Sequence, residues 1–290
     1  MFQIVGRSIQ TLSFQAAATN HGVITGAELT QRQIRELEFY EEFSERNASA
    51  EVCFDAIAGK ETRPWNSYWR LAEIARQQFK SGNQKLLDFG CGTGESSVVF
   101  ARIGYEVFGF DLSPNNISIA GRLAQKYGMT GRTHFSVSVA EKLDYPTGTF
   151  DLVVGTDILH HVDIERALEE TFRVLKTGGL AIFHEPIRSP VFDRLRETAF
   201  GKWLIPRKAS LDHHITEDER KLAQADLQII KAFDPDFTMQ RFLMFSRLDR
   251  FIRSPNSKSP SFLEKLDFKL FKIFPFLKIY GGIAVIVLRK

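Results

Sequence analysis

A short apolar segment that leads directly into three alternating glycines constrains this chain most. Residues 85–89 are mostly apolar, and Gly90, Gly92 and Gly94 follow them at every second position. An apolar run of this length next to glycine is typical of a buried strand in a parallel sheet. Glycine has no Cβ, so the backbone can turn sharply there and a ligand can lie against it. The segment therefore predicts a strand, a ligand-binding turn and a helix over 96–103.

The spacing of the glycines narrows the ligand class. A dinucleotide-binding fingerprint would need a small residue at position 95, where Glu95 stands. A Walker A loop is excluded because no Gly-Lys-Ser/Thr sequence follows. The unpaired N–H groups of the predicted helix attract an anionic group such as a carboxylate or a phosphate. A second apolar run at 105–110 leads to Asp111, and an acid roughly 20 residues beyond such a turn holds ribose hydroxyls in nucleotide-binding folds.

Five motifs in a fixed order give the chain a specific resemblance. They are Asp88-x-Gly90-x-Gly92-x-Gly94, Asp111, Val139-Ala140-Glu141-x-Leu143-x-x-Pro146, Phe150-Asp151-x-Val153 and Leu175-Lys176-x-Gly178-Gly179. Over residues 65–186 the chain resembles the class I S-adenosylmethionine (SAM) dependent methyltransferases, in particular the UbiE-like small-molecule and lipid branch. The resemblance implies an α/β fold with a Rossmann-like, seven-stranded, mostly parallel sheet and helices on both faces. It also implies methyl transfer from SAM to an oxygen, nitrogen or carbon nucleophile of a small or lipid-like molecule.

The resemblance and the predicted strand ends assign a role to the residues of these motifs. The methionine moiety of SAM is expected to lie against the glycine turn, with its ammonium facing Asp88 and the ribose hydroxyls on Asp111. The adenine edge is expected to meet Ala140 and Glu141, and Asp157 to lie near the methionine end. These acids could instead cap helices or face solvent, and that alternative stays open. The residues expected to contact SAM are Asp88, Gly90, Cys91, Gly92, Gly94, Asp111, Leu112, Ala140, Glu141 and Asp157.

Histidines follow two of the predicted strands. His160 comes shortly after the strand at 150–155, and His184 and Glu185 come directly after the strand at 180–183. These strands are neighbours in the sheet of the resembling family, so their carboxyl ends bring the side chains together. We expect His160, with His184 or Glu185, to line the acceptor site and one of the three to act as general base, since an imidazole titrates near neutral pH. A metal site, which no tight ligand spacing supports, and hydrogen bonds to loop backbone are the alternatives.

Repeated strand–helix units predict a parallel sheet with right-handed crossovers. We expect helices at 30–44, 66–79, 96–103, 114–127, 164–175, 189–200 and 216–225. We expect strands at 85–89, 105–110, 133–139, 150–155, 180–183, 227–233 and 283–288. By the resemblance, the N-terminal helices wall off the acceptor pocket with Trp65, Tyr68 and Trp69, unless these aromatic side chains belong to the core.

The chain divides into a leader and one methyltransferase domain at 29–290. The expected parts are a leader at 1–28, N-terminal helices at 29–80, the SAM-binding core at 81–186, an acceptor-side segment at 187–236, a basic aromatic helical lid at 237–280 and the last strand at 281–290. Two Ser-Pro pairs break the lid segment into two amphipathic helices, and lysines are interleaved with leucines and phenylalanines in the second. This pattern predicts either a lid packed on the sheet or a surface that touches a membrane or an apolar acceptor.

Composition limits the partners and the compartment. The net charge of +3 is too small to indicate nucleic-acid binding, and no run approaches the ~20 apolar residues of a membrane span. Two cysteines give no disulfide framework and favour a reducing compartment. We expect a cytoplasmic enzyme, peripheral to a membrane if 237–280 binds one, with SAM as cofactor, no metal, no nucleic-acid partner and a small or lipid-like acceptor. A catalytically silent SAM-binding protein and a nucleotide-dependent oxidoreductase remain as alternatives.

Overall fold

The described part of the chain covers the whole sheet but not every predicted segment. The computed structural model describes residues 29–47, 62–189, 193–194, 198, 220–252 and 261–290. The predicted leader at 1–28, the beginning of the predicted helix at 216–225 and the Ser-Pro breaks after residue 252 lie outside these residues, as does most of the predicted helix at 189–200.

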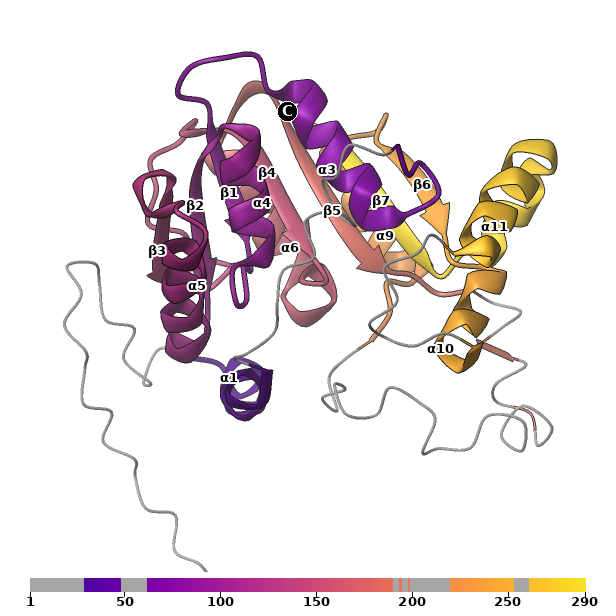
Figure 1. The fold of residues 1–290 in the computed structure, drawn as a ribbon, viewed down its shortest axis with the longest axis horizontal. Coiled ribbons are helices and arrows are strands. Elements are labelled where there is room, and N and C mark those ends of the chain that lie inside the picture. The colour runs from indigo at the N-terminus through magenta and orange to yellow at the C-terminus, as the bar shows by residue number, and fades with distance from the viewer. Residues whose placement is uncertain (1–28, 48–61, 190–192, 195–197, 199–219, 253–260) are drawn as a thin grey trace, which may run out of the picture.

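A seven-stranded sheet forms the centre of the fold, in the order β3-β2-β1-β4-β5-β7-β6 (Figure 1). Its strands are β1 (Lys85–Phe89), β2 (Glu106–Asp111), β3 (Thr133–Val137), β4 (Phe150–Thr156), β5 (Leu175–Pro186), β6 (Thr238–Phe242) and β7 (Ile283–Arg289). Strands β1 to β5 are parallel, whereas β7 runs antiparallel to both β5 and β6. This is the predicted Rossmann-like sheet. Because β1 lies between β2 and β4, the strand order reverses there, and ligands of such sheets bind at that crevice.

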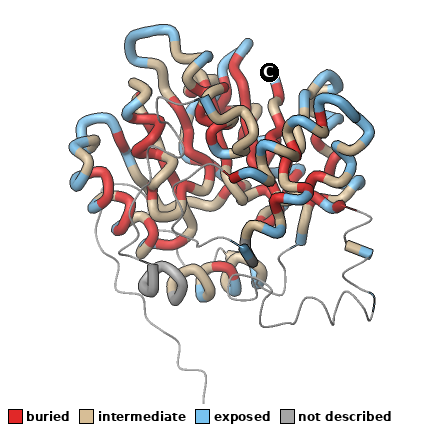
Figure 2. Tube along the Cα trace, turned by 45° about the vertical axis from the view of Figure 1, so that its right-hand side comes forward, coloured by how far each residue is buried: buried red, intermediate tan, exposed pale blue. Residues whose placement is uncertain are grey.

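Helices cover both faces of the sheet. One face carries α3 (Ser67–Gln78), α4 (Glu95–Ile103) and α5 (Pro114–Lys126), and the other carries α6 (Ile164–Val174) and α9 (Gln224–Phe233). Alternation along each strand explains this, because successive side chains point to opposite faces. In β1, for example, Leu86 packs with residues of α3 and α4, and Leu87 packs with residues of α6. The strands are accordingly the most buried part of the molecule (Figure 2).

Three helices, α1, α3 and α5, begin close to where the sequence predicts because polar side chains cap them. Asn66 accepts a hydrogen bond from the Trp69 amide at 2.9 Å before α3, and Ser113 accepts one from the Asn116 amide at 3.0 Å before α5. Helix α1 (Gln31–Asn47) follows Thr30, which forms the predicted capping box with Gln33. In Figure 1, α1 lies beyond the carboxyl ends of strands β1, β2 and β4.

One predicted strand is wrong, because residues 227–233 belong to helix α9. Leu227 and Ile230 are three residues apart, share one face of the helix and are buried in the core cluster of α6. The remaining strand of the sheet is instead β6, which begins only at Thr238 and forms the edge next to β7. The predicted helical segment at 237–280 therefore begins with a strand.

The rest of 237–280 is helical in short pieces. It contains the 3₁₀ turn η4 (Phe245–Leu248), α10 (Asp249–Ile252), α11 (Phe262–Ile273) and the 3₁₀ turn η5 (Pro275–Tyr280). Helix α11 is the predicted second amphipathic helix, and Ser261 caps it by accepting from the Glu264 amide at 3.2 Å. The predicted first helix is reduced, within the described residues, to η4 and the single turn of α10.

Candidate active site

The glycine turn after β1 has the left-handed backbone that only glycine adopts easily. Gly90, Gly92 and Gly94 have φ of 71°, 51° and 87°. A Cβ on Gly90 would lie 2.7 Å from the Ile158 side chain, so this position has no room for a larger residue. A Cβ on Gly92 would meet no atom within 4 Å, because Gly92 borders open space. The turn thus combines a fixed backbone with a free surface against which a ligand can lie.

Asp111, at the end of β2, is held beside this turn by hydrogen bonds. One carboxylate oxygen accepts from the Gly92 amide at 3.0 Å, and the other accepts from the Ser113 amide and the Asn116 side chain, both at 2.9 Å. Burial raises the pKa of Asp111, and these hydrogen bonds oppose the rise. The carboxylate is therefore fixed in position before any ligand arrives, as a ribose-binding group must be.

A pocket of about 260 Å³ lies at the carboxyl ends of β1, β2 and β4. Its walls come from five places: helix α1, the glycine turn, and the segments at the carboxyl ends of β2, β3 and β4. Of the ten residues predicted to contact the cofactor, those that line the pocket are Gly90, Gly92, Asp111, Leu112, Ala140, Glu141 and Asp157. The other three, Asp88, Cys91 and Gly94, do not line it.

Asp88 carries a buried oxygen atom that no protein group satisfies. The residue is 1% exposed, and its Oδ2 accepts from the hydroxyl groups of Ser96, at 2.7 Å, and Ser97. Its Oδ1 is buried without a hydrogen-bond partner. Burial is the largest cause that raises the pKa of Asp88, to about 6. An unsatisfied carboxylate oxygen behind a ligand-binding turn suits a ligand ammonium group, reached directly or through water, so the donor set fits the predicted cofactor.

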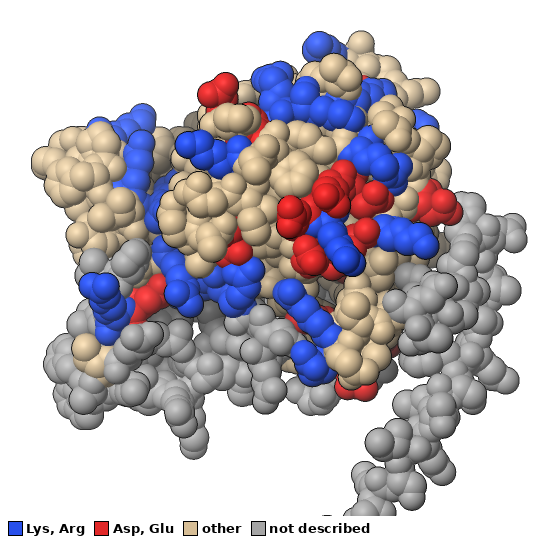
Figure 3. All heavy atoms as spheres, turned by 180° about the vertical axis from the view of Figure 1, so that it is seen from behind, with Lys and Arg blue, Asp and Glu red and all other residues tan. Residues whose placement is uncertain are grey.

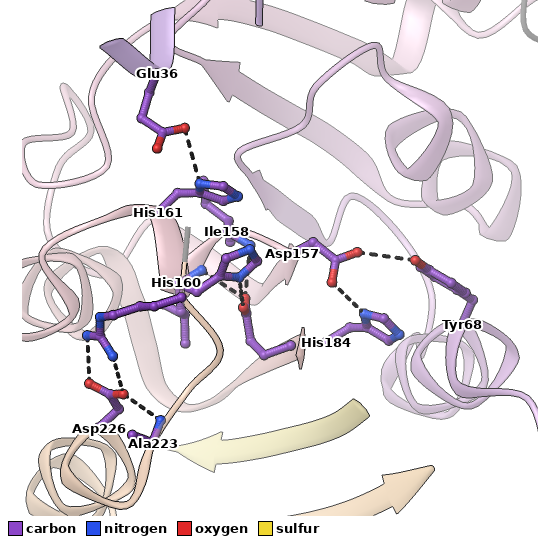
Figure 4. A network of polar contacts seen from close by, with 12 residues as sticks. Glu36, Tyr68, Asp157, Ile158, His160, His161, His184, Ala223 and Asp226 are labelled. Carbon is purple, nitrogen blue, oxygen red and sulfur yellow. Dashed lines mark hydrogen bonds and ion pairs between the residues drawn. The ribbon is translucent and has the colours of Figure 1, made fainter. Parts of the chain in front are cut away.

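Helix α1 closes the pocket through residues that the sequence analysis did not name, although the resemblance led us to expect N-terminal helices there. Gln33, Glu36 and Tyr40 line the pocket from this helix. The Gln33 amide donates to Glu141 at 3.0 Å, and Glu36 lies 3.1 Å from Nδ1 of His161, at ion-pair distance (Figure 4). These three residues have helical spacing and share one face of the helix. This polar stripe was the only feature of the sequence that could have pointed to them as pocket residues.

His161, rather than His160, is the histidine that lines the pocket. Its Nε2 lies 3.2 Å from the Tyr40 hydroxyl, and the two rings meet edge to face. The adjacent His160 turns away, and the main-chain oxygen of His160 accepts from Arg32 of α1 at 2.9 Å. Both histidines belong to the 3₁₀ turn η2 (Leu159–His161) and their ring centres lie 4.1 Å apart, but only His161 lines the pocket.

His160 and Glu185 form a buried pair that holds the η2 turn. Nδ1 of His160 lies 2.7 Å from Glu185, whose side chain is fully buried. The other oxygen of Glu185 accepts from the Ile158 amide at 3.0 Å and the Leu159 amide at 2.8 Å (Figure 4). Glu185 thus fixes the backbone that leads to His161, and neither member of the pair lines the pocket.

His184, the third predicted catalytic residue, is fully engaged with its neighbours. Nδ1 lies 3.3 Å from Asp157, and Nε2 lies 2.9 Å from the Ser67 hydroxyl. The Tyr68 ring stacks on the imidazole with ring centres 4.2 Å apart, and the Tyr68 hydroxyl donates a hydrogen bond to Asp157 at 3.1 Å (Figure 4). Asp157 itself has φ of 54°, and its amide donates to the His184 carbonyl at 2.8 Å.

The pKa of Asp157 ends below its usual range. Burial alone would raise this pKa, but the hydrogen bond from His184 and the nearby imidazoles outweigh burial. Asp157 therefore stays ionised at neutral pH while it lines the pocket. An anion here can stabilise a positively charged group of a ligand at this end of the pocket.

The three aromatic residues predicted to wall off the acceptor lie in different places. Tyr68 reaches the site through Asp157 and is 41% exposed, whereas Trp69 is buried in the core. Trp65 lies under Lys265 of α11, 5.0 Å from its Nζ. Within the described part of the chain, no group of three His, Cys, Asp or Glu side chains is arranged to hold a metal ion.

Sequence relatives of this chain are methyltransferases. Residues 87–183 match a family model described as a methyltransferase domain. The ubiquinone/menaquinone biosynthesis C-methyltransferase UbiE of Vibrio vulnificus is 29% identical over 184 residues, which are 61% of this chain and 68% of that protein. The demethylmenaquinone methyltransferase of Chlorobaculum parvum is 34% identical over 153 residues, which are 50% of this chain and 61% of that protein.

Solved structures share the fold at low sequence identity. The geranyl diphosphate C-methyltransferase of Streptomyces coelicolor A3(2) has a TM-score of 0.57 and 16% identity, with 90% of this chain and 98% of that chain covered. The [4+2]-cyclase SpnF has a TM-score of 0.55 and 20% identity, with 90% and 96% covered. These similarities establish the fold, and since one of the two proteins is a cyclase, activity has to be argued from the site.

Proposed function

Because the chain belongs to the class I SAM-dependent methyltransferases, we propose that it methylates a small, largely apolar acceptor, with a carbon atom of a quinol-like ring as the first candidate. Two observations support this acceptor class. Both curated relatives quoted above carry names from quinone methylation. The wall of the pocket beyond the glycine turn includes the apolar side chains Phe110, Ile158 and Val162.

The proposal assigns the cofactor to the glycine turn. Gly92 leaves room for the methionine moiety, and Oδ1 of Asp88 is the acceptor available to its ammonium. Asp111 binds the ribose hydroxyls, and Glu141, with Ala140 beside it, meets the adenine edge. The single observation that carries this assignment is the buried, unsatisfied oxygen of Asp88 next to an open glycine turn. We keep Cys91, Gly94 and Leu112 in the proposed cofactor-binding set.

The chain's own residues then mainly orient the two reactants. SAM supplies a methyl group already activated on a positively charged sulfur, so holding the acceptor in line is the principal requirement. Helix α1 closes the pocket and keeps water out, through Gln33 on Glu141 and Arg32 on the main chain of His160. We propose on the same grounds that 81–186 binds SAM and that the described helices of 29–80 face the acceptor. Residues 190–192, 195–197 and 199–219 of the predicted acceptor-side segment at 187–236 lie outside the described residues.

An acceptor that must lose a proton needs a base within reach of the pocket. His161 lines the pocket, and the Glu36 carboxylate beside its Nδ1 would stabilise the imidazolium that forms. His160, His184 and Glu185 were predicted for this task, and in the proposal they position the η2 turn and Asp157. His161 is therefore our first candidate for the base, and His160 is the comparison.

A methyl-transfer assay tests the proposal. Transfer of the labelled methyl group of SAM to a demethylated naphthoquinol should proceed, and His161→Asn should lower kcat by about 100-fold or more with SAM affinity unchanged. His160→Asn should leave the kcat profile against pH unchanged in shape, because His160 only positions the turn. Transfer to a hydrophilic acceptor but to no quinol would refute the acceptor class, and an unaltered kcat in His161→Asn would remove His161 as the base.

A further inference from the structure

Exposed apolar side chains gather on one side of the molecule, far along the chain from the glycine turn. Among the residues that the structure describes, nine large apolar or aromatic side chains are exposed, and eight of them lie between residues 245 and 279. Five of these eight belong to α11, to η5 or to the residue between them. We call this set, with four exposed lysines, the α11–η5 face: Phe262, Ile273, Phe274, Phe276, Ile279, Lys265, Lys269, Lys272 and Lys278.

The face is separate from the candidate active site. No described residue of 237–280 lines the pocket at the glycine turn. Helix α11 and η5 lie instead beside β6, at the opposite edge of the sheet from β3 (Figure 1). Covering the cofactor therefore does not explain why this face carries apolar side chains.

Buried contacts anchor helix α11 to the rest of the molecule on the side opposite the exposed residues. Asp267 of α11 is 3% exposed and accepts hydrogen bonds from the amides of Met244, Phe245 and Ser246, at 2.8, 2.9 and 3.0 Å. Four residues along the helix, Phe271 is buried on the same side. The opposite side of α11 faces outward and carries two exposed apolar residues and an exposed lysine.

The helical spacing places those outward residues on one stripe. Phe262, Lys269 and Ile273 stand at positions i, i+7 and i+11, which share a face of an α-helix, and all three are exposed. The stripe continues into η5, where Phe276 is 67% exposed. An apolar stripe of this kind facing water is unfavourable unless another apolar phase covers it.

The charges of the face are of one sign. The two acids of α11 are used internally: Asp267 holds the η4 backbone, and Glu264 accepts from the Asn66 side chain at 3.2 Å. The exposed charges that remain on the face are the four lysines, and blue side chains stand among tan ones over this region, at the left of Figure 3. Nζ of Lys272 lies over the Phe268 ring, 4.6 Å from the ring centre.

We propose that the α11–η5 face binds the surface of an anionic lipid bilayer. Exposed phenylalanines and isoleucines interleaved with lysines match a helix that lies in the interface, with its apolar side chains among acyl chains and its lysines at acidic headgroups. The described helices include none long and apolar enough to cross a bilayer, so the contact is peripheral. A bilayer accounts for both features of the face, whereas a second copy of this chain would bring four lysines against four lysines. The proposal does not depend on which acceptor is methylated.

Vesicle co-sedimentation of the full chain tests the proposal. Vesicles of phosphatidylcholine with phosphatidylglycerol should carry the protein down, and pure phosphatidylcholine vesicles should carry less, with binding weakened by salt. The variant Phe274→Ser/Phe276→Ser should bind at least about 10-fold more weakly. The variant Lys269→Gln/Lys272→Gln should lose about 10- to 30-fold. All four positions are exposed, so unfolding should be unaffected.

A matched control removes the same charge elsewhere. Lys80 and Lys231 are exposed outside the face, so Lys80→Gln/Lys231→Gln should keep wild-type vesicle binding. Absence of binding to the anionic vesicles, or binding that all three double variants retain equally, would overturn the proposal. A dimer in sedimentation velocity that Phe274→Ser/Phe276→Ser dissolves, without vesicle binding, would assign the face to a second copy instead.

Discussion

Replacing Asp88 by asparagine should make the ligand-free protein more stable and the cofactor complex weaker. Asp88 is a buried carboxyl whose pKa rises from its ordinary 3.8 to about 6, chiefly through burial. The folded state therefore binds more protons than the unfolded chain between about pH 4 and pH 6. Stability that is present below pH 4 is lost as the pH rises through this window.

The pKa shift sets the size of the effect. A rise of about 2 pH units, at 1.36 kcal/mol each, corresponds to about 3 kcal/mol of stability that the ionised Asp88 costs above pH 6. Asparagine resembles the protonated carboxyl in shape and can still accept from Ser96 or Ser97. Asp88→Asn should thus be up to about 3 kcal/mol more stable than wild type at pH 8 and should equal it near pH 4.

Cofactor affinity should move in the opposite direction. The unsatisfied Oδ1 of Asp88 is the proposed partner of an ammonium group, and hydrogen bonds to charged groups contribute ~1.5–3 kcal/mol. S-adenosylhomocysteine should therefore bind Asp88→Asn about 10- to 150-fold more weakly at pH 8. Urea unfolding from pH 4 to 8 and calorimetry with S-adenosylhomocysteine measure the two effects. An Asp88→Asn variant that is less stable at pH 8, or that binds as tightly as wild type, would refute the reasoning.

Two further predictions concern the turn and the buried pair. Gly92→Ala places a methyl group at the open side of the turn and should weaken S-adenosylhomocysteine binding at least about 10-fold. The control Gly128→Ala has a similar positive φ, 70° against 51°, and equally open space, so it should cost the same ~1–2 kcal/mol of backbone strain but leave binding unchanged. Equal affinities in the two variants would contradict binding of the cofactor against the glycine turn. Glu185→Ala leaves the amides of Ile158 and Leu159 and the imidazole of His160 without their acceptor. It should therefore lower the free energy of unfolding, measured in urea, by ~3–5 kcal/mol, and Glu185→Gln should recover at least half of that loss. A loss under ~1 kcal/mol in Glu185→Ala would show that Glu185 is not needed to hold the η2 turn.

The first half of the sheet could be read from the sequence because its signals are local. An apolar run, a glycine turn and a helix follow one another within residues 85–103, and the structure repeats this order as β1, turn and α4. The strand predicted at 227–233 fails because an apolar run with paired isoleucines fits a strand or a helix equally well. Only the packing of Leu227 and Ile230 against α6 decides between them, and that contact spans distant parts of the chain.

The candidate site was harder to predict for the same reason. Contacts such as Gln33 with Glu141 join residues 108 positions apart, so no local pattern places α1 over the pocket. The choice between His160 and His161 depends on their long-range partners: His160 pairs with Glu185, whereas His161 lines the pocket beside Glu36 of α1. The sequence therefore predicted which strand end lies at the site, but not which of the two imidazoles lines the pocket.

Besides Asp88, the proposed location of the cofactor requires that Asp111 bind the ribose beside the glycine turn, and one titration tests this requirement most directly. Calorimetry with S-adenosylhomocysteine should show binding to the wild-type chain and about 10- to 150-fold weaker binding to Asp111→Asn, because a ribose hydroxyl loses its charged acceptor. Circular dichroism should confirm that both proteins are folded. Absence of heat with the wild-type chain, or equal affinity in Asp111→Asn, would contradict the account.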